Sequence, residues 1–198
     1  MELLRKASVT PSRLAILPGT FNPPTLAHTG LAEAALAHAE EVLLIIPQVF
    51  PHKEYEGATL HERIAMLLIA MPDSRVSVGV TERGLFIDIA REIRPLYPDA
   101  ELLFVCGRDA AERVANWRYH GQSFERMIQE FGLLVAARNG PYEPSEQIRH
   151  AVHPLNCSNY DPISSTEVRE RMTGGRAWEH LVPAAIHDAV RRIYSKSM

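Results

Sequence analysis

The chain has 198 residues, of which 46% are hydrophobic and 23% are charged, and its formal net charge is −3. This length fits one domain with a sizeable core, and the composition argues against disorder. The slightly acidic balance provides no broad basic field for a nucleic-acid backbone, so no nucleic-acid partner is expected. An anionic ligand would therefore have to be held by a local group of donors.

The sequence also narrows the expected location. Two cysteines, Cys106 and Cys157, are too few for a disulfide framework, which favours a reducing compartment and predicts a cytoplasmic protein. The N-terminus lacks the apolar segment of a signal peptide. The longest stretch without Asp, Glu, Lys or Arg, residues 14–32, is interrupted by prolines, which excludes a membrane helix there. No membrane association is expected.

Strand and helix patterns alternate along the chain. Short apolar runs predict strands, in chain order, at 14–17, 42–46, 75–80, 102–105 and 133–137. Helical spacing of apolar residues predicts helices at 26–39, 61–71, 85–97, 110–117 and 123–130. This alternation predicts an α/β fold with a Rossmann-like, doubly wound, mainly parallel sheet of five or six strands.

The C-terminal part has a different pattern. Residues 161–198 hold an arginine-rich helix and a last amphipathic helix that begins at Pro183, a favoured first helical residue. We therefore expect one domain, 1–198, made of a core at 1–160 and a helical cap packed on the sheet. Sheets of this kind bind ligands beyond the carboxyl ends of their strands. The loops after Leu17, Ile46, Val105 and Ala137 are thus the expected place of function.

The loop after the first predicted strand, with the sequence GTFNPPTLAH from Gly19 to His28, is a candidate anion site. Gly19 permits a sharp turn, and Thr25 can cap the helix that follows, with His28 one turn further on. Amides at a helix N-terminus, a hydroxyl and an imidazole suit an anion. A proline-rich turn with a capping threonine and a core histidine is the alternative interpretation.

A second candidate is ISSTEVR, from Ile163 to Arg169. Exposed amides, hydroxyls and a guanidinium at a helix start suit a polyphosphate. Ser164 and Glu167 also have the spacing of a capping box. Both interpretations can hold, because a cap and an anion site use the same end of a helix.

Together the two segments resemble the nucleotidylyltransferase superfamily, whose signatures are (T/H)xGH and ISSTxxR; here Ala27 stands where Gly is usual. GTFNPPTLAH is similar to the form found in nicotinate or nicotinamide mononucleotide adenylyltransferases. Three further segments resemble that branch: PQVFPHK at 47–53, Gly107-Arg108-Asp109 followed by Trp117, and Leu181-Val182-Pro183. The resemblance covers nearly the whole chain, in the right order.

One segment departs from that branch. Where the family carries S-Y-T-x-D-T-L along the pyridine-nucleotide pocket, this chain has Leu85 and Phe86 at the Tyr and Thr positions, and keeps Asp88. The segments that resemble the ATP side of the site are complete, so the resemblance implies nucleotidyl transfer. It leaves the identity of the acceptor open, including the choice between nicotinate and nicotinamide mononucleotide.

The activity implied by the resemblance is transfer of AMP from ATP to a pyridine mononucleotide, with release of pyrophosphate, in NAD biosynthesis. Mg²⁺ would enter with ATP, held mostly by phosphate oxygens and water. The attacking phosphate is already an anion, so catalysis needs positioning and charge stabilisation rather than a strong base.

The same resemblance assigns residue roles. The catalytic residues it implies are Thr25, His28, Lys53 and Arg169. The ATP-binding residues it implies are Gly19, Thr20, Phe21, Thr25, His28, Gly107, Asp109, Ile163, Ser164, Ser165, Thr166 and Arg169. The acceptor-binding residues it implies are Asn22, Lys53, Leu85, Phe86, Trp117 and Arg138. Trp117 has a second interpretation as a core anchor. No metal-ligating residue is expected.

Two other functions remain open. One keeps the chemistry with a different phosphorylated acceptor, such as phosphopantetheine, or with CTP in place of ATP. The other is a nucleotide-binding protein without turnover, which the altered pocket lining suggests and the complete phosphate-binding set argues against. The sequence also leaves a homo-oligomer open, since it shows no clear heptad or exposed apolar stripe.

Overall fold

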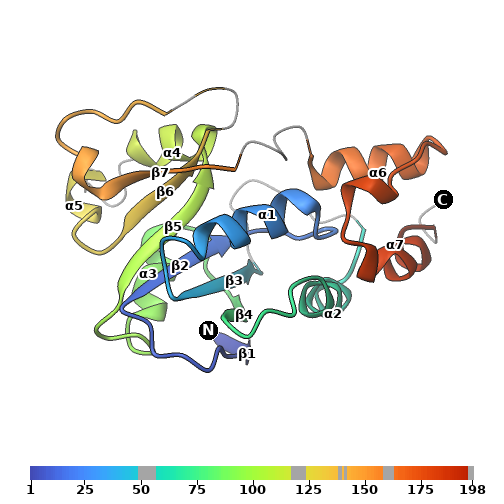
Figure 1. Ribbon diagram of the computed structural model, residues 1–198, viewed down its shortest axis with the longest axis horizontal. Coiled ribbons are helices and arrows are strands. Elements are labelled where there is room, and N and C mark those ends of the chain that lie inside the picture. The colour runs from blue at the N-terminus through green and yellow to red at the C-terminus, as the bar shows by residue number, and fades with distance from the viewer. Residues whose placement is uncertain (49–56, 117–123, 138–139, 141, 158–162, 196–198) are drawn as a thin grey trace.

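The computed structural model describes residues 1–48, 57–116, 124–137, 140, 142–157 and 163–195. A seven-stranded sheet in the order β1-β4-β3-β2-β5-β6-β7 forms the centre (Figure 1). The strands are β1 (Glu2–Arg5), β2 (Arg13–Pro18), β3 (Glu41–Pro47), β4 (Val76–Thr81), β5 (Glu101–Gly107), β6 (Gly132–Ala136) and β7 (Val152–Leu155). All neighbouring pairs are parallel except β1 with β4.

Seven α-helices occur in the described ranges: α1 (Leu26–Ala35), α2 (Leu60–Ala70), α3 (Phe86–Ile93), α4 (Arg108–Ala115), α5 (Phe124–Met127), α6 (Ser165–Thr173) and α7 (His187–Tyr194). None of these has the length and apolar character that crossing a membrane requires. The predicted α/β, Rossmann-like architecture is confirmed.

The sheet has seven strands rather than the expected five or six. The two edge strands, β1 and β7, were not predicted from the sequence pattern. Each has only four residues and is partly exposed, so neither carries a continuous apolar run. Strand β7 also contains Pro154, which argues against a central strand but is tolerated at an edge.

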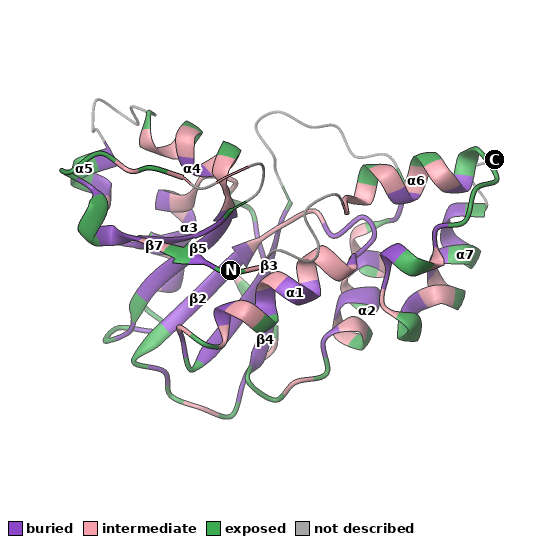
Figure 2. Ribbon diagram, turned by 45° about the horizontal axis from the view of Figure 1, so that its top comes forward, coloured by how far each residue is buried: buried purple, intermediate pink, exposed green. Residues whose placement is uncertain are grey.

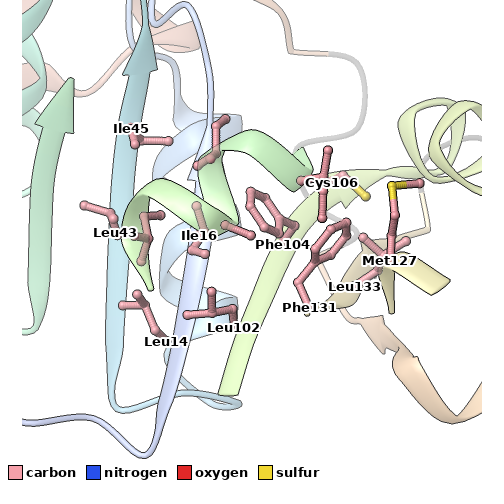
Figure 3. Packing of buried hydrophobic residues seen from close by; sticks show 14 of the residues in the cluster. Leu14, Ile16, Leu43, Ile45, Leu102, Phe104, Cys106, Met127, Phe131 and Leu133 are labelled. Carbon is pink, nitrogen blue, oxygen red and sulfur yellow. The ribbon is translucent and has the colours of Figure 1, made fainter. Parts of the chain in front are cut away.

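Both faces of the sheet are apolar. Along β2, Leu14 and Ile16 belong to one buried cluster with α3, α4 and α5, whereas Ala15 and Leu17 belong to another with α1 and α2. Figure 3 shows part of the first cluster, with Phe104 between Ile16 and Phe131. Figure 2 shows that the inner strands are mostly buried: β3 is buried throughout, whereas β2 and β5 each begin with an exposed residue. Double-sided burial explains why these strands read as apolar runs.

The C-terminal helices α6 and α7 lie beside α2 at one end of the molecule (Figure 1). They share a third buried cluster whose described members come from residues 58–70 and 163–194, with no strand residue among them. The expected packing of the cap on the sheet is therefore corrected: the cap packs on α2, which in turn packs on the sheet through Leu67, with Met71 just after the helix.

The strand order places a topological switch point between β2 and β5. The chain runs outward from β2 to β3 and β4, then returns through α3 to β5 on the other side of β2. The register pairs Ile16 with Phe104, and its continuation brings Gly19 level with Gly107. Ligands bind at such a point, beyond the carboxyl ends of the two strands.

The buried core predicts a stability difference between two leucines. Leu43 in β3 is fully buried, whereas Leu96 is 44% exposed. Leu43→Ala should lower the free energy of unfolding by about 2–5 kcal/mol through lost burial and a residual cavity. Leu96→Ala should change it by no more than about 0.5 kcal/mol. Urea denaturation of both variants checks this, and equal losses would contradict the packing described.

Candidate active site

The loop after β2 turns back tightly over its own start. The Gly19 amide donates to the Ile45 carbonyl at 3.1 Å, which extends the pairing of β2 with β3. The Phe21 ring folds over Gly19, so that a Cβ at Gly19 would lie 2.9 Å from Phe21 Cζ. Phe21 itself has a φ of 47°. Left-handed backbone at a non-glycine residue costs about 1–2 kcal/mol, so the surroundings must hold the turn in place.

Thr25 and His28 form a unit at the start of α1. Thr25 is the fully buried N-cap residue. Its backbone amide donates to His28 Nδ1 at 3.0 Å, and its Oγ1 lies 2.7 Å from the same nitrogen. The amide can only donate, so Nδ1 is the acceptor and the ring hydrogen of the neutral imidazole is on Nε2. The predicted N-cap position of Thr25 is confirmed, and its contact with His28 leaves Nε2–H as the group that can donate to an anion.

The start of α6 is bound to this same loop. Ser165 Oγ donates to the Pro23 carbonyl at 2.8 Å, and Arg169 Nη1 donates to the Asn22 carbonyl at 2.6 Å. Ser164 Oγ accepts from the Glu167 amide at 3.1 Å, which confirms the capping role of Ser164. The two motifs, about 140 residues apart in sequence, thus place the N-termini of α1 and α6 against one loop.

The chemistry of this junction suits a polyphosphate. Arg169 is half-buried, and its Nη2 lies 3.4 Å from Thr166 Oγ1, so the guanidinium and an exposed hydroxyl share one turn of α6. The positive ends of two helices, hydroxyl groups and a guanidinium all stabilise negative charge. Ile163, which precedes the N-cap residue Ser164, packs against the buried cluster that α6 and α7 share with α2.

Two residues that the sequence did not indicate also hold the loop. Arg63 of α2 is 4% exposed, and its Nη1 donates to the Thr20 carbonyl at 3.1 Å. Tyr194 of α7 is 6% exposed, and its hydroxyl lies 2.5 Å from Asn22 Oδ1. One sequence feature points to Arg63, because it is a charged residue on the same buried face of α2 as Met66. No sequence feature points to Tyr194.

Asn22 makes contacts with the protein from both its side chain and its backbone. Besides the Tyr194 hydroxyl, Oδ1 accepts from the Ala58 amide at 3.1 Å. The backbone carbonyl accepts from Arg169. The structure thus shows Asn22 holding the loop, while its predicted contact with the acceptor stays a prediction.

The β5 side of the switch point carries Gly107 and Asp109. Gly107 is the N-cap of α4, and a Cβ there would meet no described atom within 4 Å. Among the described residues, none fills the space beside this backbone, as close approach of a ligand requires. Asp109 is exposed in the first turn of α4. Both lie on the expected side of the sheet, and their contacts with ATP stay predictions.

The altered pocket residues lie at the start of α3. Leu85 is its half-buried N-cap. The Phe86 ring stacks on Phe104 of β5, with 4.4 Å between ring centroids and 12° between planes, and Phe131 meets Phe86 edge-on at 6.3 Å. Phe86 thus extends an aromatic cluster of the core to the molecular surface. The remaining predicted residues, Lys53, Trp117 and Arg138, lie outside the described residues.

Cys106, next to Gly107, gives a prediction about thiol reactivity. Burial raises the pKa of Cys106 to about 12, so at pH 8 the thiol stays protonated and is a poor nucleophile. Iodoacetamide at pH 8 should therefore modify the half-buried Cys157 well before Cys106, and both should react in urea. Mass spectrometry of the time course checks this; rapid modification of Cys106 in the folded protein would contradict its burial.

A doubly wound sheet with two helix starts, hydroxyl groups and a guanidinium gathered at its switch point is the arrangement expected of a nucleotidyltransferase. The sequence model of the family described as cytidylyltransferase-like matches residues 16–171. The probable nicotinate-nucleotide adenylyltransferase of Citrifermentans bemidjiense is 31% identical over 212 residues, which cover 92% of this chain and 98% of the relative. That of Thermus thermophilus is 32% identical over 182 residues, which cover 88% and 94%. The chain therefore belongs to the cytidylyltransferase-like family, in its nicotinate-nucleotide adenylyltransferase branch.

Solved structures agree on the fold. Plasmodium falciparum nicotinic acid mononucleotide adenylyltransferase complexed with NaAD has a TM-score of 0.69 to this chain at 20% identity. The match covers 93% of this chain and 98% of the Plasmodium chain. The same architecture therefore extends over both proteins.

Proposed function

We propose that this protein transfers AMP from ATP to nicotinate mononucleotide and releases pyrophosphate, a step of NAD biosynthesis. The observation that carries the proposal is the binding of the α6 start to the loop after β2, which gathers Thr25, His28, Ser165 and Arg169 at one junction. The names of the relatives from Citrifermentans bemidjiense and Thermus thermophilus support nicotinate mononucleotide as the acceptor.

The reaction needs no proton abstraction from the nucleophile. A phosphate oxygen of the acceptor forms a bond to the α-phosphorus of ATP, and the bond from that phosphorus to the bridging oxygen breaks. The bonding electrons leave with pyrophosphate. The residues at the junction stabilise the negative charge that gathers on the phosphoryl oxygens and the leaving group. In this arrangement His28 donates from Nε2, while the Ser165 backbone amide, Thr166 and Arg169 bind the outer phosphates.

Mg²⁺ belongs to this proposal as the ion that ATP brings. The described residues at the two helix starts provide hydroxyl, amide and guanidinium groups, and no three His, Cys, Asp or Glu side chains within the described ranges form a metal-binding group. This donor set fits a metal held by phosphate oxygens and water rather than by a protein cage. When bound, the ion offsets phosphate charge.

The expected location is the cytoplasm. Neither Cys106 nor Cys157 is in a disulfide, which suits a reducing compartment. The expected partners are the two small-molecule substrates, without nucleic acid, and a homo-oligomer is compatible with the proposal.

Pyrophosphate release by the purified protein tests the function. The assay contains ATP and Mg²⁺ with nicotinate mononucleotide, nicotinamide mononucleotide or phosphopantetheine, and a parallel series replaces ATP with CTP. We expect the highest kcat/KM with ATP and nicotinate mononucleotide. Turnover only with phosphopantetheine or only with CTP would overturn the acceptor or the donor. ATP binding without turnover in any mixture would indicate a non-catalytic nucleotide-binding protein.

His28→Ala should lower kcat by about a hundredfold, about 3 kcal/mol of transition-state stabilisation, because one preorganised donor is removed. His38→Ala is the matched control. His38 lies just beyond the C-terminal end of α1, about 15 Å along the helix axis from His28. Its kcat should match that of the unsubstituted protein. A folded His28→Ala variant with unchanged kcat would remove His28 from the mechanism.

A further inference from the structure

The Asn22 side chain connects three segments that are distant in sequence. Asn22 is 4% exposed, and its Oδ1 accepts from the Ala58 amide, just before α2, and from the Tyr194 hydroxyl of α7. Gly57 packs directly against this pair: a Cβ there would lie 3.0 Å from Tyr194 Cε1 and 3.1 Å from Asn22 Oδ1. The two hydrogen bonds to Oδ1 hold the Asn22 carboxamide in one orientation, and Gly57 leaves room for them.

Tyr194 is the donor in this contact. Burial raises the pKa of the Tyr194 phenol above its usual range, so the hydroxyl keeps its proton. Asn22 Oδ1 can only accept. The ring of Tyr194 belongs to the buried cluster that joins α7 to α2 and α6. The hydroxyl is thus held at Asn22 by the packing of the whole cap.

The backbone on either side of Asn22 is restricted, so a movement of Asn22 would also move the start of α1. Phe21, on one side, has a left-handed backbone under a buried ring. Pro23 and Pro24, on the other side, have φ locked by their rings, so only ψ rotations remain between Asn22 and Thr25. A displacement of Asn22 would therefore reach Thr25 rather than being absorbed by the loop.

We propose that Tyr194 is a positioning residue for nucleotidyl transfer, which acts through Asn22 on the loop that carries Thr25 and His28. In this proposal the effect of Tyr194 is indirect, through the hydrogen bond from its hydroxyl to Asn22 Oδ1. The C-terminal helix α7 then positions the loop that carries Thr25 and His28, in addition to packing against α2 and α6. The expected effect of Tyr194 on kcat rests on the proposed function. Its expected effect on the position of the loop rests on the structure alone.

Tyr97 provides a matched control for removal of a buried phenol hydroxyl. Tyr97 is 4% exposed, and its hydroxyl lies 2.6 Å from Oε1 of Glu41. Glu41 is the first residue of β3, at the amino end of the sheet and so at the opposite end from the site. Tyr97→Phe therefore removes the same group from an equally buried hydrogen bond without touching the loop.

The kinetic experiment compares Tyr194→Phe with Tyr97→Phe. Tyr194→Phe should lower kcat by about tenfold while KM for the acceptor changes little, because a small displacement of catalytic groups lowers the rate of the chemical step. Tyr97→Phe should lose thermal stability and keep both constants. A kcat for Tyr194→Phe equal to that of the unsubstituted protein would overturn the proposal.

A double-mutant cycle tests whether Tyr194 acts through the loop. In a His28→Ala background, Tyr194→Phe should cause much less than its single-variant loss of kcat, since the group it positions is gone. A full loss in that background would show that Tyr194 acts independently of His28 and would contradict the proposal.

Hydrogen–deuterium exchange gives a readout that does not depend on activity. Tyr194→Phe should speed exchange in peptides spanning residues 18–30, and Tyr97→Phe should not. If the unsubstituted protein releases no pyrophosphate, the proposed function fails, and this exchange comparison still decides whether α7 holds the loop. Unchanged exchange at residues 18–30 in Tyr194→Phe would overturn the inference.

Discussion

The structure depends on how the loop after β2 satisfies its backbone carbonyls. Three of them, at Thr20, Asn22 and Pro23, each accept from a side chain of a helix distant in sequence: Arg63 of α2, and Arg169 and Ser165 of α6. Bonds from a guanidinium are stronger than those between neutral groups, so two of the three are of the stronger kind. The cap is therefore joined to the core at the functional loop as well as through its apolar cluster.

This bonding also sets the orientation of the loop. A trans peptide places C=O and N–H on opposite sides, so binding the Thr20 carbonyl to Arg63 turns the Phe21 amide away from α2. Thr25 then fixes the His28 tautomer, and α6 brings a second helix start to the same place. The structure gathers imidazole, hydroxyl and guanidinium groups at one junction, which is the preorganised arrangement that the proposed transfer would require. The proposed reaction needs no strong base, because its nucleophile is already an anion, so positioned donors are its main requirement.

The sequence predicted the centre of the fold better than its edges. The five central strands were predicted because burial on both faces leaves continuous apolar runs, whereas β1 and β7 are short and half-exposed. The segments at 19–28 and 163–169 were assigned to one site through family resemblance, and the structure brings them together. The contacts of Arg63 and Tyr194 with the loop could not be predicted. Their partners are a backbone carbonyl and a side chain more than 40 residues away, and no local pattern encodes such contacts.

A crystal structure with a non-hydrolysable ATP analogue tests the central claim most directly. The account predicts that the triphosphate lies between the starts of α1 and α6, with His28 Nε2 and the Arg169 guanidinium each about 3 Å from a phosphate oxygen. The Asn22, Pro23 and Tyr194 contacts should be unchanged in that complex. A triphosphate bound away from both helix starts, or one that displaces α6 from the loop, would contradict it.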